Sequence, residues 1–132
     1  MTDSRTRVLV VDDSATIRSL ISINLWLAGY DVTEARDGHE CLSLVSSTQP
    51  DLITLDVAMP GLDGFATVGR LRADPATASM PIVMVTARTS PADVQRATAL
   101  GVDGYVTKPF EPAELVALVQ SLSPAGQVSQ PR

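Results

Sequence analysis

The chain has 132 residues, 45% of them hydrophobic, and carries ten basic side chains against fifteen acidic ones. This length fits one compact domain, and a charged fraction of 19% is too low for a disordered, self-repelling chain. The net charge of −5 and the lack of any run of basic residues exclude a general nucleic-acid surface. Lys108 is the sole lysine, because the other nine basic residues are arginines.

A single cysteine, Cys41, cannot form an intramolecular disulfide or a C-x-x-C metal site, and this favours a reducing cytoplasm. We expect Cys41 to be a small core residue. The first residues lead into an apolar stretch of about five residues, far short of the ~20 that a membrane span needs. We therefore expect a cytoplasmic chain without a membrane segment.

Short β-branched runs alternate with longer segments of helical period along the chain. The runs predict strands at residues 8–11, 31–35, 52–55, 81–85 and 104–107. Helical segments are expected from Ser14 to Gly29, from Asp37 to Pro50, from Gly64 through Leu71, from Pro91 to Leu100 and from Pro112 to Leu122. This alternation predicts an α/β fold with a doubly wound parallel five-stranded sheet and helices on both faces.

The predicted strands end in polar residues of a particular kind. Asp12 and Asp13 follow the first strand, Asp56 follows the third, Thr86 the fourth and Lys108 the fifth. In open α/β sheets the ligand site lies beyond the carboxyl ends of the strands, so these side chains are expected to converge on one rim. The second strand, expected at the sheet edge, contributes nothing comparable.

Three carboxylates on one rim repel each other unless a proton or a cation neutralises them. Mg²⁺ suits such a set, because it prefers hard oxygen ligands and often shares one or two carboxylates with a phosphate. Lys108 would then provide a point charge for a phosphoryl oxygen, and Thr86 a hydroxyl donor for another. The residues therefore favour phosphoryl transfer. Capping of the first helix is the plain alternative for Asp12 and Asp13.

Other chemistries find little support in the sequence. No Ser/His/Asp or Cys/His set is available, because the lone His39 follows the Asp37-Gly38 turn, away from the predicted rim, and is expected to be a surface residue. Neither a Walker A loop nor a G-x-G-x-x-G motif occurs, which argues against a nucleotide enzyme.

Four blocks of sequence stand out: Val10-Val-Asp-Asp13, Leu55-Asp-Val-Ala-Met-Pro-Gly61 with Asp63-Gly64, Val85-Thr-Ala87, and Tyr105-Val-Thr-Lys-Pro-Phe110. Together they resemble the signature blocks of the receiver domain of two-component response regulators. Each block lies at a predicted strand end, and the resemblance covers roughly residues 6 to 122. It implies a flavodoxin-like (βα)5 fold with strand order 2-1-3-4-5. We expect a receiver domain at residues 7–122, after an N-terminal extension (1–6) and before a tail or linker stub (123–132).

The resemblance also implies roles for individual residues. Asp56 would be the phosphoacceptor, which takes the phosphoryl group of a histidine kinase or phosphotransfer protein as an acyl phosphate. Mg²⁺ would be held by Asp13, Asp56 and the main-chain carbonyl of Ala58, with Asp12 acting largely through water. Lys108 would pair with the phosphoryl group, and the bond before Pro109 would be cis.

By the same resemblance, Thr86 would rotate toward the phosphoryl group and let Tyr105 turn inward. The surface of the fourth helix, fifth strand and fifth helix would then change and control a downstream protein or a linked output domain. A phosphorylation-dependent homodimer is a further option. The alternatives are an interaction module that works without phosphorylation and a flavodoxin-like cofactor binder, which lacks the Ser/Thr/Gly loop after the first strand.

Three departures from common receiver patterns follow from the sequence. Ala58 and Arg88 stand where many receivers carry side chains that tune acyl-phosphate hydrolysis, so the hydrolysis rate stays open. No Lys or Arg occurs between Pro109 and Pro131, so the basic dimer face of winged-helix regulators is not reproduced.

The first helix has two apolar faces at ~100° per residue. A core face is predicted for Ile17, Leu20, Ile21, Leu25 and Ala28. Ile23 and Trp26 point away from that face. They form either a docking patch for a kinase or phosphotransfer helix, since aromatic residues are favoured at interface centres, or a solvent-facing pair with no role.

Overall fold

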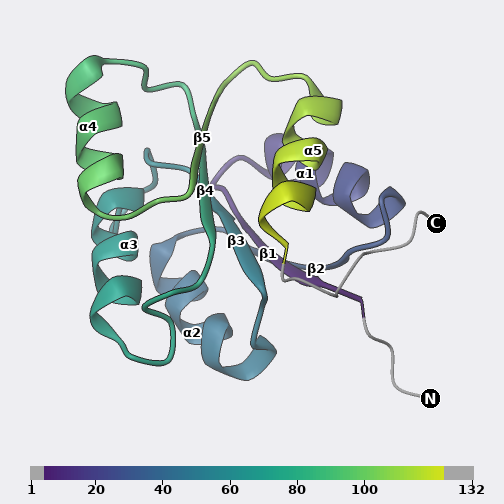
Figure 1. Ribbon diagram of the computed structural model, residues 1–132, viewed down its shortest axis with the longest axis horizontal. Coiled ribbons are helices and arrows are strands. Elements are labelled where there is room, and N and C mark those ends of the chain that lie inside the picture. The colour runs from purple at the N-terminus through teal and green to yellow at the C-terminus, as the bar shows by residue number, and fades with distance from the viewer. Residues whose placement is uncertain (1–4, 124–132) are drawn as a thin grey trace.

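A computed structural model describes residues 5–123 of the chain (Figure 1). Its five strands all run parallel, in the order β2-β1-β3-β4-β5. The strands are β1 (Arg7–Val11), β2 (Asp31–Ala35), β3 (Leu52–Leu55), β4 (Ile82–Thr86) and β5 (Gly104–Thr107). Strand number, order and direction confirm the predicted flavodoxin-like fold, and β2 lies at the sheet edge as expected.

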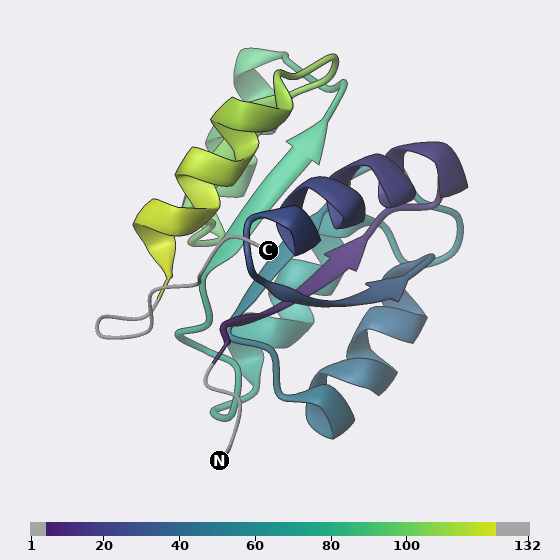
Figure 2. The ribbon, with the colours of Figure 1, turned by 90° about the vertical axis from the view of Figure 1, so that its right-hand side faces the viewer.

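Five helices alternate with the strands and cover both faces of the sheet. They are α1 (Ala15–Leu27), α2 (Gly38–Thr48), α3 (Gly64–Ala73), α4 (Pro91–Ala99) and α5 (Pro112–Leu122). Figure 2 shows α1 and α5 side by side on one face, where they contact each other. The other three helices lie on the opposite face (Figure 1).

Local sequence sets where several helices begin. The side chains of Ser14, Asp37, Asp63 and Ser90 each accept a hydrogen bond from the backbone N–H three residues later, so they cap α1, α2, α3 and α4. Pro91 and Pro112 each start their helix at a position where no N–H is needed. These caps fix the helix starts beside the carboxyl ends of the strands.

Two hydrophobic clusters hold the layers together. Leu9, Leu55 and Met84 anchor the cluster under α2, α3 and α4, while Val10 and Val83 face α1 and α5. The three inner strands, β1, β3 and β4, are almost continuously apolar because both of their faces are covered. Cys41 is buried in the first cluster, as predicted, and burial raises the pKa of its thiol to about 12, so the thiol stays protonated at neutral pH.

The structure corrects several predictions at the level of single residues. β1 begins at Arg7, one residue earlier than predicted, and β4 begins at Ile82 and includes Thr86, one residue later than predicted. Leu20, predicted on the core face of α1, is 40% exposed. The helix rests on the sheet along the narrower stripe of Ile17, Ile21 and Leu25, and Leu20 falls at the border of that stripe.

The amino-terminal ends of β4 and β5 are tied together by Arg72, at the end of α3. Its guanidinium donates to the carbonyls of Thr77, Ala78 and Met80 before β4, at 3.4, 3.0 and 2.7 Å, and to Gly101 O before β5, at 2.6 Å. Asp103 accepts from Arg72 at 3.3 Å and also from the backbone N–H of Ile82 at 2.8 Å. We call this set of contacts the Arg72 network.

Two predictions concern the ends of the chain and the membrane. The domain limits at residues 7 and 122 stay predictions, and most of the expected tail lies outside the described residues. Among residues 5–123, no helix has the length and apolar character to cross a membrane.

Candidate functional site

The carboxylates after β1 and β3 meet at the carboxyl rim of the sheet. Because β1 pairs with β3 with Val11 opposite Leu55, the residues that follow these two strands lie side by side. Carboxylate oxygens of Asp12, Asp13 and Asp56 all lie within 4.8 Å of one another. Asp12 and Asp56 are buried, whereas Asp13 is exposed. The structure thus brings together the three acids that were predicted to converge.

Lys108 lies between the two buried carboxylates. Its Nζ donates to Asp12 Oδ2 at 2.7 Å and to Asp56 Oδ2 at 2.9 Å. Burial raises the pKa of Asp12 above its ordinary value, although the hydrogen bond from Lys108 opposes this shift. Burial lowers the pKa of Lys108, but the hydrogen bonds to both carboxylates outweigh burial and raise it overall, so the ammonium stays charged. One cation therefore neutralises part of the buried negative charge.

The turn after β1 is held by contacts on both sides. The backbone N–H of Ser14 donates to Asp12 Oδ1 at 2.9 Å. Arg18, in the first turn of α1, donates to the carbonyl oxygen of Asp12 at 2.8 Å and pairs with Glu34 at 2.9 Å. Arg18 was not among the predicted site residues, because its partner Glu34 lies sixteen residues further along the chain.

Close packing between the start of α3 and the loop after β3 fixes the backbone of Asp56. Gly64 donates its N–H to Val57 O at 2.8 Å. A Cβ on Gly64 would lie 2.2 Å from the carbonyl oxygen of Asp56, so no larger residue fits there without moving the backbone. Ala58 is exposed, and its N–H lies 3.4 Å from Asp56 Oδ1. The small residues at 58 and 64 leave the rim open while the backbone of Asp56 is held.

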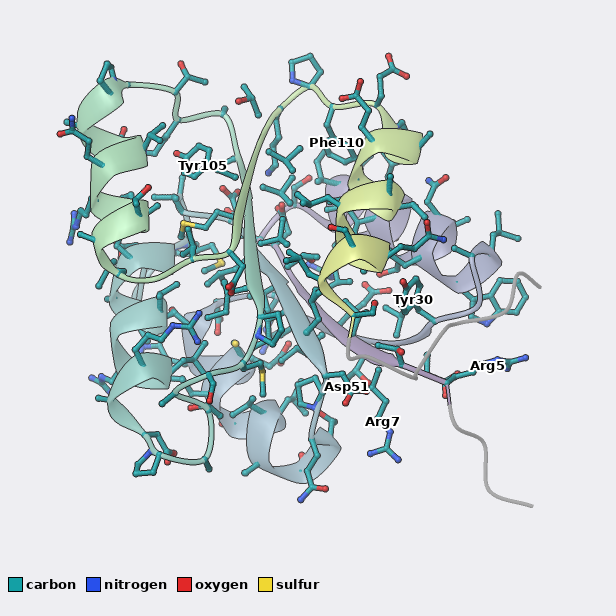
Figure 3. The ribbon with its side chains drawn as sticks, viewed as in Figure 1. Arg5, Arg7, Tyr30, Asp51, Tyr105 and Phe110 are labelled. Atoms are coloured by element: carbon teal, nitrogen blue, oxygen red, sulfur yellow. The ribbon has the colours of Figure 1, made fainter. Side chains whose placement is uncertain are left out.

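Thr86 and Tyr105 are linked through one residue of the loop after β4. Thr86 is fully buried, and its Oγ1 accepts a hydrogen bond from the backbone N–H of Arg88 at 3.2 Å. Tyr105, which points from β5 toward α4 in Figure 3, donates its hydroxyl to the carbonyl oxygen of Arg88. Arg88 also pairs with Asp93 on α4 at 3.3 Å. A change at Thr86 can therefore reach Tyr105 and α4 through this loop.

The segment from Tyr105 to Pro109 joins this loop to Lys108. The backbone N–H of Lys108 donates to the carbonyl oxygen of Thr86 at 2.9 Å. The Lys108–Pro109 peptide bond is cis, the isomer that the resemblance implies. Thr86, Tyr105 and Lys108 thus form one connected strip at the ends of β4 and β5.

Ile23 and Trp26 lie away from the acidic rim, on the outer side of α1. They are 57% and 50% exposed, and Leu27 is 50% exposed beside them. A shallow pocket of about 240 Å³, lined by both side chains together with Ser22, Val32 and Glu34, lies between α1 and β2. With Leu20, these side chains make an apolar surface larger than the predicted pair.

Comparisons with known proteins agree on one family. The model of the family described as "Response regulator receiver domain" matches residues 8–120. The chain is 45% identical over 116 residues to the DNA-binding dual master transcriptional regulator RpaA of Synechocystis, a match that covers 88% of this chain and 48% of the relative. It is 41% identical over 121 residues to the DNA-binding response regulator MtrA of Mycobacterium tuberculosis, covering 92% and 52%.

A solved structure of the chemotaxis protein CheY4 of Vibrio cholerae matches with a TM-score of 0.85 and 39% identity, covering 89% of this chain and 98% of that one. The chain thus spans nearly all of this structure but about half the length of the curated relatives it matches.

Proposed function

The chain belongs to the response regulator receiver domain family of two-component systems, and on this basis we propose that Asp56 accepts a phosphoryl group from a histidine kinase or phosphotransfer protein in a Mg²⁺-dependent reaction. The observation that carries the proposal is the position of Lys108 between the buried carboxylates of Asp12 and Asp56, with Asp13 beside them. A phosphorylation-independent interaction module is not favoured, because it would not need this complete set.

The geometry of Asp56 supports its role as the nucleophile. A carboxylate oxygen would form a bond to phosphorus while the P–N bond to the donor histidine breaks, and the phosphoryl group moves to Asp56 as an acyl phosphate. Lys108 keeps its positive charge at neutral pH and already contacts Asp56. Its ammonium is therefore in place to pair with a phosphoryl group on Asp56. The compact ammonium suits a single phosphoryl oxygen.

The acids around Asp56 fit Mg²⁺. Asp13 is exposed and has no side-chain partner among the described residues, so its carboxylate is available, and Asp56 lies within 4.8 Å of it. Asp13, Asp56 and the carbonyl of the exposed Ala58 would hold the ion, with Asp12 acting through water. When bound, Mg²⁺ neutralises charge on the phosphoryl oxygens and orients them.

The strip from Thr86 to Tyr105 provides the proposed switch. The hydroxyl of Thr86 is buried beside the site and would turn to the phosphoryl group, which would release the N–H of Arg88. Arg88 also holds Tyr105 and Asp93, so the surface of α4, β5 and α5 would respond. New phosphate contacts favour one packing over the other by differential binding.

The outer face of α1 is proposed to dock the phosphodonor. Ile23 and Trp26, with Leu20 and Leu27, expose apolar side chains that a helix of a kinase or phosphotransfer protein could cover. Replacing Trp26 with Ala should slow phosphotransfer from the cognate kinase about tenfold, while phosphorylation by a small phosphodonor stays unchanged. Unchanged phosphotransfer from the kinase would remove the docking role.

The output is proposed to be either a separate protein target or a domain linked to this one. Two of the relatives carry DNA-binding in their names, and the chain spans about half of each. We expect no direct nucleic-acid contact from this chain, since its net charge is −5. A cytoplasmic location stays an expectation.

Intact mass spectrometry tests the acceptor role. Wild-type protein incubated with a small phosphodonor and Mg²⁺ should gain the mass of one phosphoryl group, and Asp56→Asn should not. The gain should be lost when a chelator replaces Mg²⁺, and Asp13→Asn should need more Mg²⁺ to reach it. An equal gain in Asp56→Asn would contradict the assignment.

A further inference from the structure

A groove between β5 and the first turns of α5 has no role in the phosphoryl chemistry. Its volume is about 540 Å³, and its apolar walls include Tyr105, Val106, Phe110 and Leu118. Figure 3 shows Tyr105 and Phe110 on opposite sides of β5, toward α4 and α5 respectively. Glu111 and Glu114 line the same groove, and both are exposed. Aromatic walls beside two carboxylates distinguish this groove from the apolar surface on α1.

Glu111 and Glu114 differ from the other acids of residues 5–123. Outside the phosphoacceptor site, every other described acid caps a helix or turn, pairs with an arginine or has another partner, for example Glu34 with Arg18 and Asp103 with Arg72. Within the described chain, Glu111 and Glu114 have no side-chain hydrogen bond or ion pair. Both carboxylates are therefore available to pair with a cation of another molecule.

Three cations of the neighbouring elements already have partners. Lys108 is held by Asp12 and Asp56, and Arg88 pairs with Asp93. Arg96 on α4 lies over the ring of Phe65, with its guanidinium carbon 4.4 Å from the ring centroid. The positive end of the helix dipole stabilises Glu111 and Glu114 at the start of α5, but no side-chain cation of the described chain pairs with them.

We propose that this groove binds a cationic amphipathic segment of another protein, whose apolar side chains enter between Tyr105, Phe110 and Leu118 while Lys or Arg side chains pair with Glu111 and Glu114. This rests on the proposed function, because it names the partner of the surface that phosphorylation is proposed to change. Complementary charge sets the orientation and specificity of such a segment, and the buried aromatic contacts supply most of its affinity.

A second copy of this chain fits the groove less well than a basic partner. A two-fold dimer through α5 brings the same patch of both copies together, so the interface would contain Glu111 and Glu114 from each copy. α5 itself carries no Lys or Arg that could pair with them. Like charges across an interface oppose association, so the surface disfavours self-association through α5.

The groove is built on the strip that also holds Lys108. Tyr105 and Phe110 flank Lys108 along the chain, and Tyr105 is tied to the loop of Arg88. If Lys108 leaves Asp12 for a phosphoryl group, the walls of the groove move with it. Phosphorylation should therefore change the affinity of the cationic segment.

Fluorescence anisotropy with labelled model peptides tests the proposal. The probes are an amphipathic Leu/Lys helix and its Leu/Glu counterpart with the same apolar face. The Leu/Lys peptide should bind about tenfold more tightly than the Leu/Glu peptide, and more weakly as salt is raised. The double variant Glu111→Gln/Glu114→Gln should bind it about threefold to tenfold less tightly than wild type.

A matched control separates the groove from overall charge. Glu40→Gln/Asp74→Asn removes the same two charges from α2 and the end of α3, and keeps side-chain oxygens for their backbone partners. This control should bind the Leu/Lys peptide within about twofold of wild type. Equal binding of both peptides, or equal loss in both double variants, would overturn the proposal, and so would a phosphorylated dimer that excludes the peptide in sedimentation.

The phosphorylation state is checked by intact mass in the same samples. If no phosphoryl group is gained but the Leu/Lys peptide still depends on Glu111 and Glu114, the proposed function fails and the groove stands. If the phosphoryl group is gained and the peptide shows no such dependence, the groove proposal fails alone.

Discussion

The two ends of the sheet each collect oxygen atoms around one cation, but they use different cations and different oxygens. At the carboxyl rim, the ammonium of Lys108 contacts two carboxylates, Asp12 and Asp56. At the opposite end, the guanidinium of Arg72 contacts four backbone carbonyls and Asp103. A charged carboxylate can take a metal ion in place of the lysine, whereas a carbonyl carries no net charge and attracts a cation less strongly on its own.

The two cations allow one end of the sheet to be rigid while the other end responds to a ligand. Arg presents five donors in a fixed fork, so it can join two loops in a single geometry. Lys presents a compact charge on a flexible stem, so it can move with its partner. We therefore expect changes at Arg72 to reduce stability and spare phosphorylation. Changes at Lys108 should spare stability and impair the response to phosphorylation.

The largest expected effect is the swap Arg72→Lys. An ammonium cannot reach the loops before β4 and β5 together, so several carbonyls lose their donor, and the free energy of unfolding should fall by about 3 kcal/mol. Urea unfolding measured by circular dichroism gives this value. Arg70→Lys is the matched control, since Arg70 is exposed on the same helix, and it should change stability by less than about 0.5 kcal/mol. A similar small change in both variants would remove the structural role of the Arg72 network.

A second effect separates two glycines of α3. Gly64→Ala should lower the free energy of unfolding by about 2 kcal/mol, because its Cβ would lie 2.2 Å from Asp56 O and 2.7 Å from Val57 Cα. Gly69→Ala should raise it by about 0.5 to 1 kcal/mol, since a Cβ there meets nothing within 4 Å and alanine favours a helix. Opposite signs in thermal or urea unfolding are the expected result. If both variants lowered the free energy of unfolding, the contact between Gly64 and Asp56 would not explain the cost of adding a Cβ to α3.

The reciprocal substitution, Lys108→Arg, tests the cation at the carboxyl rim of the sheet. Charge is kept, so stability should change by less than about 1 kcal/mol, but the planar fork does not fit between Asp12 and Asp56 as a single ammonium does. Binding of the Leu/Lys peptide should then no longer change on phosphorylation. A variant that still shows a normal change would leave Lys108 without a specific role in the switch.

The smallest effect concerns Asp12 and has a defined pH dependence. Burial raises the pKa of Asp12 in the folded state, so the folded protein binds more protons than the unfolded chain, and ionisation of Asp12 costs stability as the pH rises through that range. Asp12→Asn should therefore be about 1 kcal/mol more stable than wild type at pH 7 without Mg²⁺. The gain should shrink toward zero as the pH falls below the ordinary pKa of an aspartate. A gain that does not depend on pH would assign the effect to packing.

Several features of the fold and the site could be predicted from the sequence. Alternating apolar runs and helical periods predicted all five strands and helices, because strands covered on both faces must be apolar. Asp12, Asp13, Asp56 and Lys108 could be placed together because parallel strands end at one rim, whatever the details of packing. Residues that follow strand ends are located by topology alone.

Other features depended on contacts between distant parts of the chain. Arg18 and Arg72 look like ordinary helix arginines in the sequence, and only the packing of α1 against β2, and of α3 against the loops before β4 and β5, gives them partners. Leu20 lies on the border of a helix face, so its exposure depends on how α1 tilts on the sheet. Glu111 and Glu114 could likewise be recognised as unpaired only once the partners of the arginines within residues 5–123 were known.

The sequence by itself determined the strand order through its family signature, the convergence of the acids and the place of the sole lysine. Tertiary structure alone decided which cation holds which oxygen, which acids remain unpaired and which apolar residues stay exposed. The physical reason is range: strand and helix periods and the residues at strand ends are local properties, whereas a side chain's partner depends on the packing of segments far apart in the chain.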